Sequence, residues 1–216
     1  MKIFEKLKKL ENIEVLKKNS INLPEDIGYL LPISKYFINQ EDRILDLTEW
    51  RNLNCFAYPS VFEATYKSTK DWLENNLLRN DSKILFFILD HSDDYIGHIG
   101  LNIPVNNNSY IEIDNVSRGL NKSKGIMSIS TIALINWSIK ELGISDIRLK
   151  VLKSNKNAIN FYKKLGFTYL SEVSLYKYEN KDGFVLSTKK ELEKKGQLSI
   201  DFSKPNDFFI TMKYHL

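Results

Sequence analysis

The sequence predicts an α/β domain that carries a helical extension at its N-terminus, and three observations support this fold class. Short apolar runs bounded by polar residues, such as KILFFILD at residues 83–90, have the length of strands buried on both faces. From about Asp42 onward, segments with helical spacing alternate with these runs. Two of the helical segments end at Gly143 and Gly166, and glycine is the residue that most often follows a helix.

The composition is that of one globular domain with a substantial core. The chain has 216 residues, of which 43% are hydrophobic and 27% are charged, and its net charge is +4. This mild basic excess suits an anionic small ligand and does not indicate nucleic acid as a partner. The single cysteine, Cys55, excludes an internal disulfide, and the three histidines lack metal-ligand spacing, so we expect no metal. No run approaches the ~20 apolar residues of a membrane span. The N-terminus lacks the apolar core of a signal peptide, so a cytoplasmic protein is expected.

The first 40 residues are expected to form a helical extension and a linker, followed by one domain over residues 41–216. Residues 2–18 have the spacing of an amphipathic helix with mixed charges. Such a helix can lie on a membrane surface or pack against the domain or a partner chain. Residues 21–32, INLPEDIGYLLP, are predicted to be a loop or linker because they contain two prolines and one glycine.

The remaining elements follow in order along the chain. We expect a helix to start within residues 46–51, and a second helix over residues 68–78 to be capped by the Ser or Thr that precedes Asp71. Residues 106–108, three asparagines, are expected to form a turn. Residues 179–206 are charged and weakly patterned, and we interpret them as an insertion before the last strand. The predicted strands are 83–90, 95–103, 110–116, 147–152, 167–178 and 208–214, and the later helices are 127–142 and the segment from Asn155 to Gly166.

A loop rich in lysine and glycine, SRGLNKSKGIM at residues 117–127, stands between a predicted strand and a predicted helix. Free backbone amides and the helix dipole at a helix N-terminus attract an anion such as a pyrophosphate. Arg118, Lys122 and Lys124 add positive charge, and Gly125 permits close approach of the backbone. The loop matches neither the P-loop nor the GxGxxG pattern. Taken alone, it is also consistent with a plain connection.

A second motif, NKNAINFYKKLGF at residues 155–167, has the pattern of a short amphipathic helix. Asn155 is expected to cap its N-terminus, and Gly166 to follow its C-terminus. Ala158 and Tyr162 share one face by their spacing. This face could simply pack in the core, or it could hold a ligand and aim a catalytic hydroxyl.

Together, in this order, the two motifs resemble the GNAT superfamily of N-acetyltransferases. The family's acyl-CoA loop, Q/R-x-x-G-x-G/A, is matched here by Lys122, Gly125 and Met127. Lysine replaces the usual Gln or Arg, and Met127 replaces the second Gly or Ala. The family's next motif is matched by Asn155, Ala158 and Tyr162, followed by K-x-G-F ending at Phe167. The resemblance covers about residues 44–178, with residues 208–214 as the final strand.

The resemblance implies a mixed central sheet flanked by helices and splayed open between strands 110–116 and 147–152, where the pantetheine arm of acetyl-CoA lies. Acetyl-CoA would be a co-substrate, held without a metal. Tyr162 would protonate the leaving thiolate, since a phenol with a pKa of ~10 holds its proton at neutral pH. The residues implied in cofactor binding are Val116, Arg118, Lys122, Lys124, Gly125, Ile126, Met127, Asn155, Ala158 and Tyr162. Backbone amides near Val116 would polarise the thioester carbonyl, as in the family.

The amine that accepts the acetyl group must lose a proton, and three side chains are candidates for the base. Glu112 and Asp114 lie on one face of strand 110–116 because side chains in a strand alternate. His98, on the preceding strand, has an ordinary pKa of ~6.5 that suits proton abstraction. Each of these residues could instead have a structural role, and the sequence leaves the choice open.

The acceptor side is represented by EWRNLN at residues 49–54. This stretch and DNVSRG at residues 114–119 look like GNAT enzymes that acetylate nucleotide-linked amino sugars in surface-polysaccharide synthesis. Arg51 and Asn52 would then bind substrate, with the Arg51 guanidinium meeting a diphosphate; Arg51 could equally satisfy loop carbonyls. The same framework serves ribosomal-protein or peptide amines, and also a CoA-binding module without turnover. A small primary amine is the expected substrate, and a homodimer is one candidate assembly.

Overall fold

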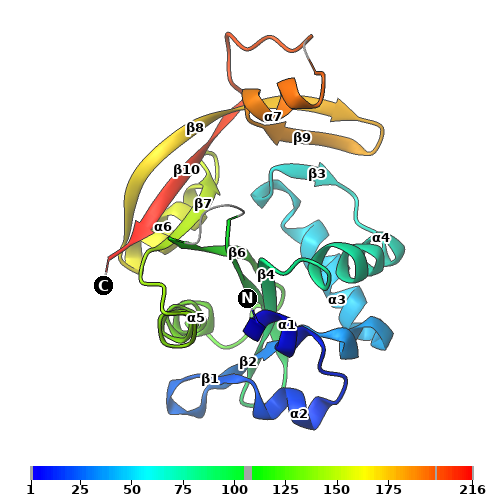
Figure 1. Ribbon diagram of the computed structural model, residues 1–216, viewed down its shortest axis with the longest axis vertical. Coiled ribbons are helices and arrows are strands. Elements are labelled where there is room, and N and C mark those ends of the chain that lie inside the picture. Colours follow the sequence, from blue (N-terminus) through cyan, green and yellow to red (C-terminus); the bar gives the residue numbers. More distant parts are fainter. Residues whose placement is uncertain (1, 105–108, 198, 216) are drawn as a thin grey trace. The chain divides into compact units, whose positions relative to one another are not determined.

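The computed structural model describes residues 2–104, 109–197 and 199–215. These residues fold into two compact units, shown with their elements in Figure 1. The first unit comprises Met1–Leu53 and Ala64–Ile147, and the second comprises Asn54–Glu63 and Arg148–Leu216. The predicted turn at residues 106–108 lies outside the described residues.

The first unit contains an antiparallel sheet in the order β1-β2-β4-β5-β6. Its strands are β1 (Ile21–Asn22), β2 (Gly28–Pro32), β4 (Lys83–Asp90), β5 (Tyr95–Asn102) and β6 (Ile111–Arg118). Its helices are α1 (Lys2–Lys8), α2 (Ile13–Lys18), η1 (Pro24–Asp26), η2 (Lys35–Asn39), α3 (Glu41–Leu53), α4 (Tyr66–Trp72), η4 (Leu73–Leu77) and α5 (Ile126–Leu142). The three central strands agree with the predicted ones to within two residues at each end.

The second unit is also built on antiparallel strand pairs, in the order β7-β10-β8-β9-β3. The strands are β3 (Ser60–Phe62), β7 (Ile147–Leu152), β8 (Phe167–Asn180), β9 (Gly183–Ser187) and β10 (Asp207–Tyr214). The helices are η3 (Cys55–Ala57), α6 (Lys156–Lys164) and α7 (Lys189–Lys194). Part of the stretch interpreted as an insertion therefore extends the sheet, since β9 pairs with both β8 and β3.

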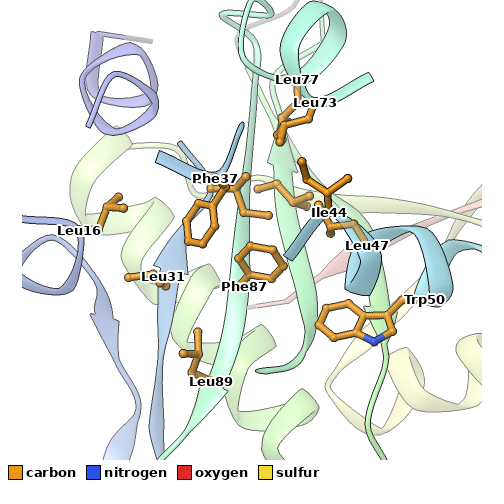
Figure 2. Close-up of a cluster of buried hydrophobic side chains, with 12 residues drawn as sticks. Leu16, Leu31, Phe37, Ile44, Leu47, Trp50, Leu73, Leu77, Phe87 and Leu89 are labelled. Atoms are coloured by element: carbon orange, nitrogen blue, oxygen red, sulfur yellow. The ribbon is translucent and has the colours of Figure 1, made fainter. Parts of the chain in front are cut away.

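The apolar run of β4 is continuous because side chains from other elements cover both faces of the strand. Phe87 lies in a cluster with residues of α2, α3 and η4 (Figure 2). Phe86, on the opposite face, meets Trp137 of α5 edge-on, with ring centroids 5.7 Å apart. The side chains on the Phe87 face form the main core of this unit: Leu16, Leu31, Ile33, Phe37, Ile44, Leu47, Trp50, Leu73, Leu77, Leu85, Phe87 and Leu89.

The N-terminal region differs from its prediction in two respects. The single helix expected over residues 2–18 is two helices, because the Asn12 side chain accepts hydrogen bonds from the amides of Glu14 and Val15 and starts α2 anew. The expected linker is also partly wrong, since β2 pairs in register with β4. Leu16 is fully buried in the core cluster, so the packing interpretation of these helices is favoured over a membrane surface.

Two helix starts also differ from the sequence-based boundaries. Helix α3 begins at Glu41, several residues before the expected start. Helix α4 is capped by Thr65, not by Ser68 or Thr69, because Thr65 and Ser68 form a reciprocal capping box. The C-terminal glycines are confirmed: Gly143 ends α5 with φ 68°, and Gly166 follows α6 with φ 96°.

Candidate active site

Strand β6 contains a β-bulge at the position where the sequence places the candidate base and the carbonyl-polarising amide. His98 of β5 is opposite Ser117, and Gly100 is opposite Asp114. Two residues of β6, Asn115 and Val116, therefore lie opposite a single residue of β5. Asn115 adopts a left-handed conformation with φ 49°, which is typical of a bulge that redirects the backbone.

The two candidate carboxylates of β6 have different surroundings. Asp114 forms an ion pair with Lys83 of β4 at 2.8 Å, and its side chain is 33% exposed. The Asn115 side-chain amide also donates to Asp114, at 2.9 Å. Glu112 is only 8% exposed and accepts a hydrogen bond from Asn102 at 3.2 Å. Of the two carboxylates, Asp114 is therefore the one that solvent reaches.

His98 is buried against the bulge. Its Nδ1 lies 2.7 Å from the carbonyl oxygen of Asn115, and its ring stacks on Trp50 of α3 at 6.0 Å. A carbonyl can only accept, so Nδ1 must carry the proton. Burial lowers the pKa of His98 to about 4, against the opposing effects of the Asn115 hydrogen bond and the Asp114 charge. The imidazole is therefore neutral at physiological pH and holds a second proton weakly, which makes it a poor general base.

The loop at residues 117–127, hereafter the first motif loop, is shaped by its own side chains. The Arg118 guanidinium donates to the carbonyls of Leu120 and Lys122. Lys122 pairs with Asp94 at 2.7 Å, in the turn between β4 and β5. These two basic residues therefore organise the loop in this structure, while Lys124 is exposed.

Asp90, at the end of β4, anchors the same loop and was not singled out from the sequence. Its carboxylate accepts from the Ser123 hydroxyl at 2.7 Å and from the amides of Ser92 and Asp94. Burial opposes ionisation of Asp90, but these hydrogen bonds outweigh it and lower the pKa. Ser123 is held with φ 54°, so the carboxylate stabilises an unusual backbone conformation just before the helix.

Helix α5 begins after an exposed glycine. Its N-cap is Gly125, with φ 88° and no atom within 4 Å of the position that a Cβ would occupy. The helix has 17 residues, and the first of them, Ile126 and Met127, bury their side chains. The amides of Ile126 and Ser128 donate to the carbonyls of Ser123 and Gly125, so an anion would meet the other amides of this turn. Met127 replaces a small residue of the family motif, but its side chain turns inward to the core.

The second motif forms helix α6 as predicted. The Asn155 side chain accepts from the amide of Ala158 at 3.1 Å, so the predicted cap is confirmed. Tyr162 is 8% exposed, and its ring packs edge-on against Phe161 and Phe167, at 5.1 and 5.7 Å. The Ser154 hydroxyl, just before the cap, donates to Asp207 of β10. The predicted packing role of Tyr162 is therefore present, and its aromatic neighbours fix the direction of the ring.

The two candidate acceptor residues lie on α3. The Asn52 side chain both donates to the carbonyl of Ala64 and accepts from its amide, at 2.9 and 2.8 Å. These two hydrogen bonds use both polar atoms of the Asn52 side chain and connect α3 to the segment before α4. Arg51, the neighbouring candidate, is partly exposed.

The structure therefore groups the candidate residues by unit. Strands β5 and β6, with the first motif loop and α5, carry the candidate bases and the anion-binding amides, while α6 carries Asn155, Ala158 and Tyr162. Within the described residues, no group of three or more His, Cys, Asp or Glu side chains is arranged to hold a metal ion. No helix in the described part of the chain has the length and apolar character needed to span a membrane.

Comparisons with known proteins identify the family of the chain and its fold. Residues 38–168 match the family model described as an acetyltransferase (GNAT) domain. No curated protein matches the sequence significantly. Three solved structures that share the fold illustrate the similarity. A probable acetyltransferase of the GNAT family from Chromobacterium violaceum is 15% identical, with a TM-score of 0.62, and the match covers 89% of this chain and 84% of that chain. An acetyltransferase from Salmonella typhimurium that modifies the N-terminal serine of ribosomal protein L7/L12 is 13% identical, with a TM-score of 0.61 and coverages of 88% and 95%. A spermidine N-acetyltransferase from Vibrio cholerae, in complex with CoA and spermine, is 14% identical, with a TM-score of 0.59 and coverages of 85% and 92%.

Proposed function

The chain belongs to the GNAT acetyltransferase family, and from that premise we propose that it transfers the acetyl group of acetyl-CoA to a primary amine of a small molecule. The observation that carries this proposal is the exposed N-terminus of α5. Gly125 opens it in a left-handed conformation, and Asp90 fixes Ser123 just before it. Backbone amides arranged in this way bind the pyrophosphate of a nucleotide cofactor without a metal.

The proposed reaction is a direct transfer. The amine attacks the thioester carbonyl, and the resulting oxyanion is stabilised by the backbone amide of Val116 at the β6 bulge. The C–S bond then breaks, and Tyr162 donates its phenolic proton to the departing sulfur. The protein needs no covalent acyl intermediate for these steps.

Asp114 is the proposed general base. It immediately precedes the bulge, and its carboxylate is one-third exposed, so an amine or a relaying water can reach it. Glu112 is the second candidate because it lies on the same strand, although it is 8% exposed. We do not assign the base to His98, because its buried imidazole binds a second proton weakly.

The proposed acceptor is an amino sugar linked to a nucleotide diphosphate. The proposal rests on the resemblance of EWRN and DNVSRG to enzymes of that type, with the Arg51 guanidinium contacting the diphosphate. Asn52 would act indirectly, by holding α3 to Ala64. Two of the enzymes with the same fold acetylate spermidine and the N-terminal serine of a ribosomal protein. These amines are therefore the alternative acceptors against which the amino sugar is tested.

The test measures free thiol released from acetyl-CoA with three acceptors: a UDP-linked amino sugar, a peptide with an N-terminal serine, and spermidine. We expect turnover with the amino sugar, and Arg51→Gln should raise its KM by about tenfold or more, because one charge-assisted contact is lost. Turnover that is confined to the peptide or to spermidine contradicts the proposed acceptor and leaves the acetyltransferase assignment in place.

A CoA-binding module without turnover is the second candidate function. The observation in its favour is that Lys122, at the family's Gln/Arg position, forms an ion pair with Asp94. Saturable binding of acetyl-CoA by calorimetry, without thiol release in the presence of any of the three amines, would support it. Turnover with one amine excludes it.

A further inference from the structure

The bulge of β6 has a buried support on β5 that the proposed reaction does not use directly. Asn115 is held with φ 49°, a left-handed conformation that asparagine tolerates better than most non-glycine residues do. Its carbonyl oxygen lies 2.7 Å from Nδ1 of His98. The imidazole is 5% exposed, so this hydrogen bond forms away from bulk water, where losing it is costly.

The imidazole is itself fixed by its surroundings. Trp50 stacks on its face with the two ring planes 30° apart. The same indole lies against the backbone just after β6, since a Cβ at Gly119 would come within 2.0 Å of the Trp50 ring. On β5, a Cβ at Gly97 would come within 2.3 Å of the Ser117 carbonyl oxygen. The bulge is thus enclosed on both sides by close packing, and His98 provides its polar contact.

The charged surroundings of the bulge come from β4 and β6. Asp114 accepts from the Asn115 side chain and from Lys83. Both sides of Asn115 are therefore hydrogen bonded, its carbonyl to His98 and its side-chain amide to Asp114. The orientation of the next peptide unit, which carries the Val116 amide, depends on both contacts.

We propose that His98 is a positioning residue: by donating its Nδ1–H to the Asn115 carbonyl, it fixes the β6 bulge and so aims the Val116 amide at the thioester carbonyl of acetyl-CoA. The proposal rests on the proposed function, because it names what orients the oxyanion-stabilising amide. It differs from the interpretation of His98 as a general base, in which Nε2 would take up the proton of the amine. The ring is only 5% exposed, and this burial disfavours that role.

A matched pair of amide variants tests this role. His98→Asn places an NH₂ group near the position of Nδ1 and can still donate to the Asn115 carbonyl, whereas His98→Gln places its NH₂ group near the position of Nε2. We expect His98→Gln to lower kcat by about tenfold, as for one lost hydrogen bond, with the Kd of acetyl-CoA and the shape of the pH–rate profile unchanged. His98→Asn should restore most of kcat. Equal loss in both variants, or disappearance of the acidic limb of the profile in both, overturns the proposal.

A second measurement is independent of turnover, and so separates failure of this proposal from failure of the proposed function. The ¹⁵N chemical shifts of the His98 ring report its tautomer, and hydrogen exchange reports the order of the Val116 amide. We expect a protonated Nδ1 and a bare Nε2 at pH 7, and faster exchange at Val116 in His98→Gln than in His98→Asn. A protonated Nε2 with a bare Nδ1, or equal exchange in the two variants, contradicts the positioning role even if no acceptor is ever found.

Discussion

The two motifs that led to the family differ in what holds them in shape. The second motif, residues 155–167, keeps the family pattern and is stabilised by near neighbours in the sequence, since Asn155 caps the amide of Ala158. The first motif loop departs from the pattern at two positions and is stabilised by distant residues. Asp90 accepts a hydrogen bond from Ser123, 33 residues away in the sequence, and Asp94 pairs with Lys122, 28 residues away.

This difference teaches that a loop that departs from the consensus pattern can be ordered by contacts with residues distant in the sequence. In the first motif loop the conformation is imposed by a buried carboxylate and by loop carbonyls that accept from Arg118. Of the residues at the consensus positions, Lys122 contacts Asp94 and Met127 is buried, so neither position holds the residue of the pattern and the loop is still hydrogen bonded. In the second motif the residues of the pattern themselves make the helix cap and the aromatic packing.

The largest expected effect belongs to the second motif. Tyr162→Phe keeps the ring that packs against Phe161 and Phe167 but removes the proposed proton donor. General acid catalysis contributes about 10²–10⁴-fold, so we expect kcat to fall by that order while the Kd of acetyl-CoA stays the same. Single-turnover kinetics measure the chemical step directly. An unchanged single-turnover rate removes Tyr162 from the reaction and leaves it with packing alone.

A pH experiment examines His98, which contacts the β6 bulge just before the first motif loop. Its pKa is about 4 in the folded protein, because of burial, against an ordinary value of 6.5. The His98 imidazole therefore takes up a proton near pH 6.5 in the unfolded chain, but only near pH 4 in the folded chain. The stability that the neutral, buried His98 contributes is complete above pH 6.5. As the pH falls from 6.5 to 4, the free energy of unfolding decreases by up to about 3 kcal/mol.

Because other groups titrate in the same range, the measurement is a difference. Urea unfolding of the parent and of His98→Asn at pH 7 and at pH 4.5 should show a smaller loss in the variant. The Asp114 carboxylate, whose charge acts to raise the pKa of His98, is present in both proteins. Equal losses in both would show that the imidazole is not buried as described.

The anchor of the first motif loop is tested by Asp90→Ala. The variant leaves the Ser123 hydroxyl and two turn amides without their carboxylate acceptor. Hydrogen bonds to a charged group are worth about 1.5–3 kcal/mol, so we expect the Kd of acetyl-CoA to rise by about tenfold or more. Asp93→Ala is the matched control: it removes the same charge from the same turn, but Asp93 bonds Tyr29 and Lys17. If both variants bind acetyl-CoA equally, Asp90 does not shape the loop.

Substitutions of two glycines of α5 distinguish an effect of backbone strain on stability from an effect on acetyl-CoA binding. Gly125 and Gly143 stand at opposite ends of α5, both with positive φ and with open space around the missing Cβ. Alanine at either position should cost about 1–2 kcal/mol of stability, seen as similar falls in Tm. Only Gly125→Ala should also weaken acetyl-CoA binding. Asn tolerates this conformation, so Gly125→Asn should recover part of the Tm.

The same contrast explains which parts of the molecule the sequence could predict. Helix α6 and its cap were found because Asn155 and Gly166 act within a few residues of their own positions. Strand β4 was found because its apolar run has clear polar boundaries, and β7 because apolar and polar residues alternate along it. The family pattern then supplied the catalytic interpretation of Tyr162, which spacing alone did not.

The misses involve partners that are distant in sequence, or caps that were overlooked. Asp90 was overlooked because its partner Ser123 is on another element; the only local signal is its turn with Ser92 and Asp94. Strand β2 was interpreted as linker because Gly28 and its prolines suggest a loop, whereas pairing with β4 decides its structure. The break between α1 and α2 had a local signal, the cap residue Asn12, which the amphipathic spacing concealed.

The smallest expected effect concerns the altered consensus residue itself. The side chains of Lys122 and Asp94 are 59% and 43% exposed, so solvent and salt screen this ion pair and it contributes little to stability. We expect Lys122→Ala to change the Kd of acetyl-CoA by less than about fivefold, because the loop keeps its Asp90 anchor. Asp94→Asn should instead tighten binding slightly, and more at low salt, by releasing the Lys122 ammonium toward the phosphates. A large loss in Lys122→Ala would mean that this lysine leaves Asp94 when the cofactor binds and fully replaces the family's Gln or Arg. The first motif loop would then depend on its side chains as much as the second motif does.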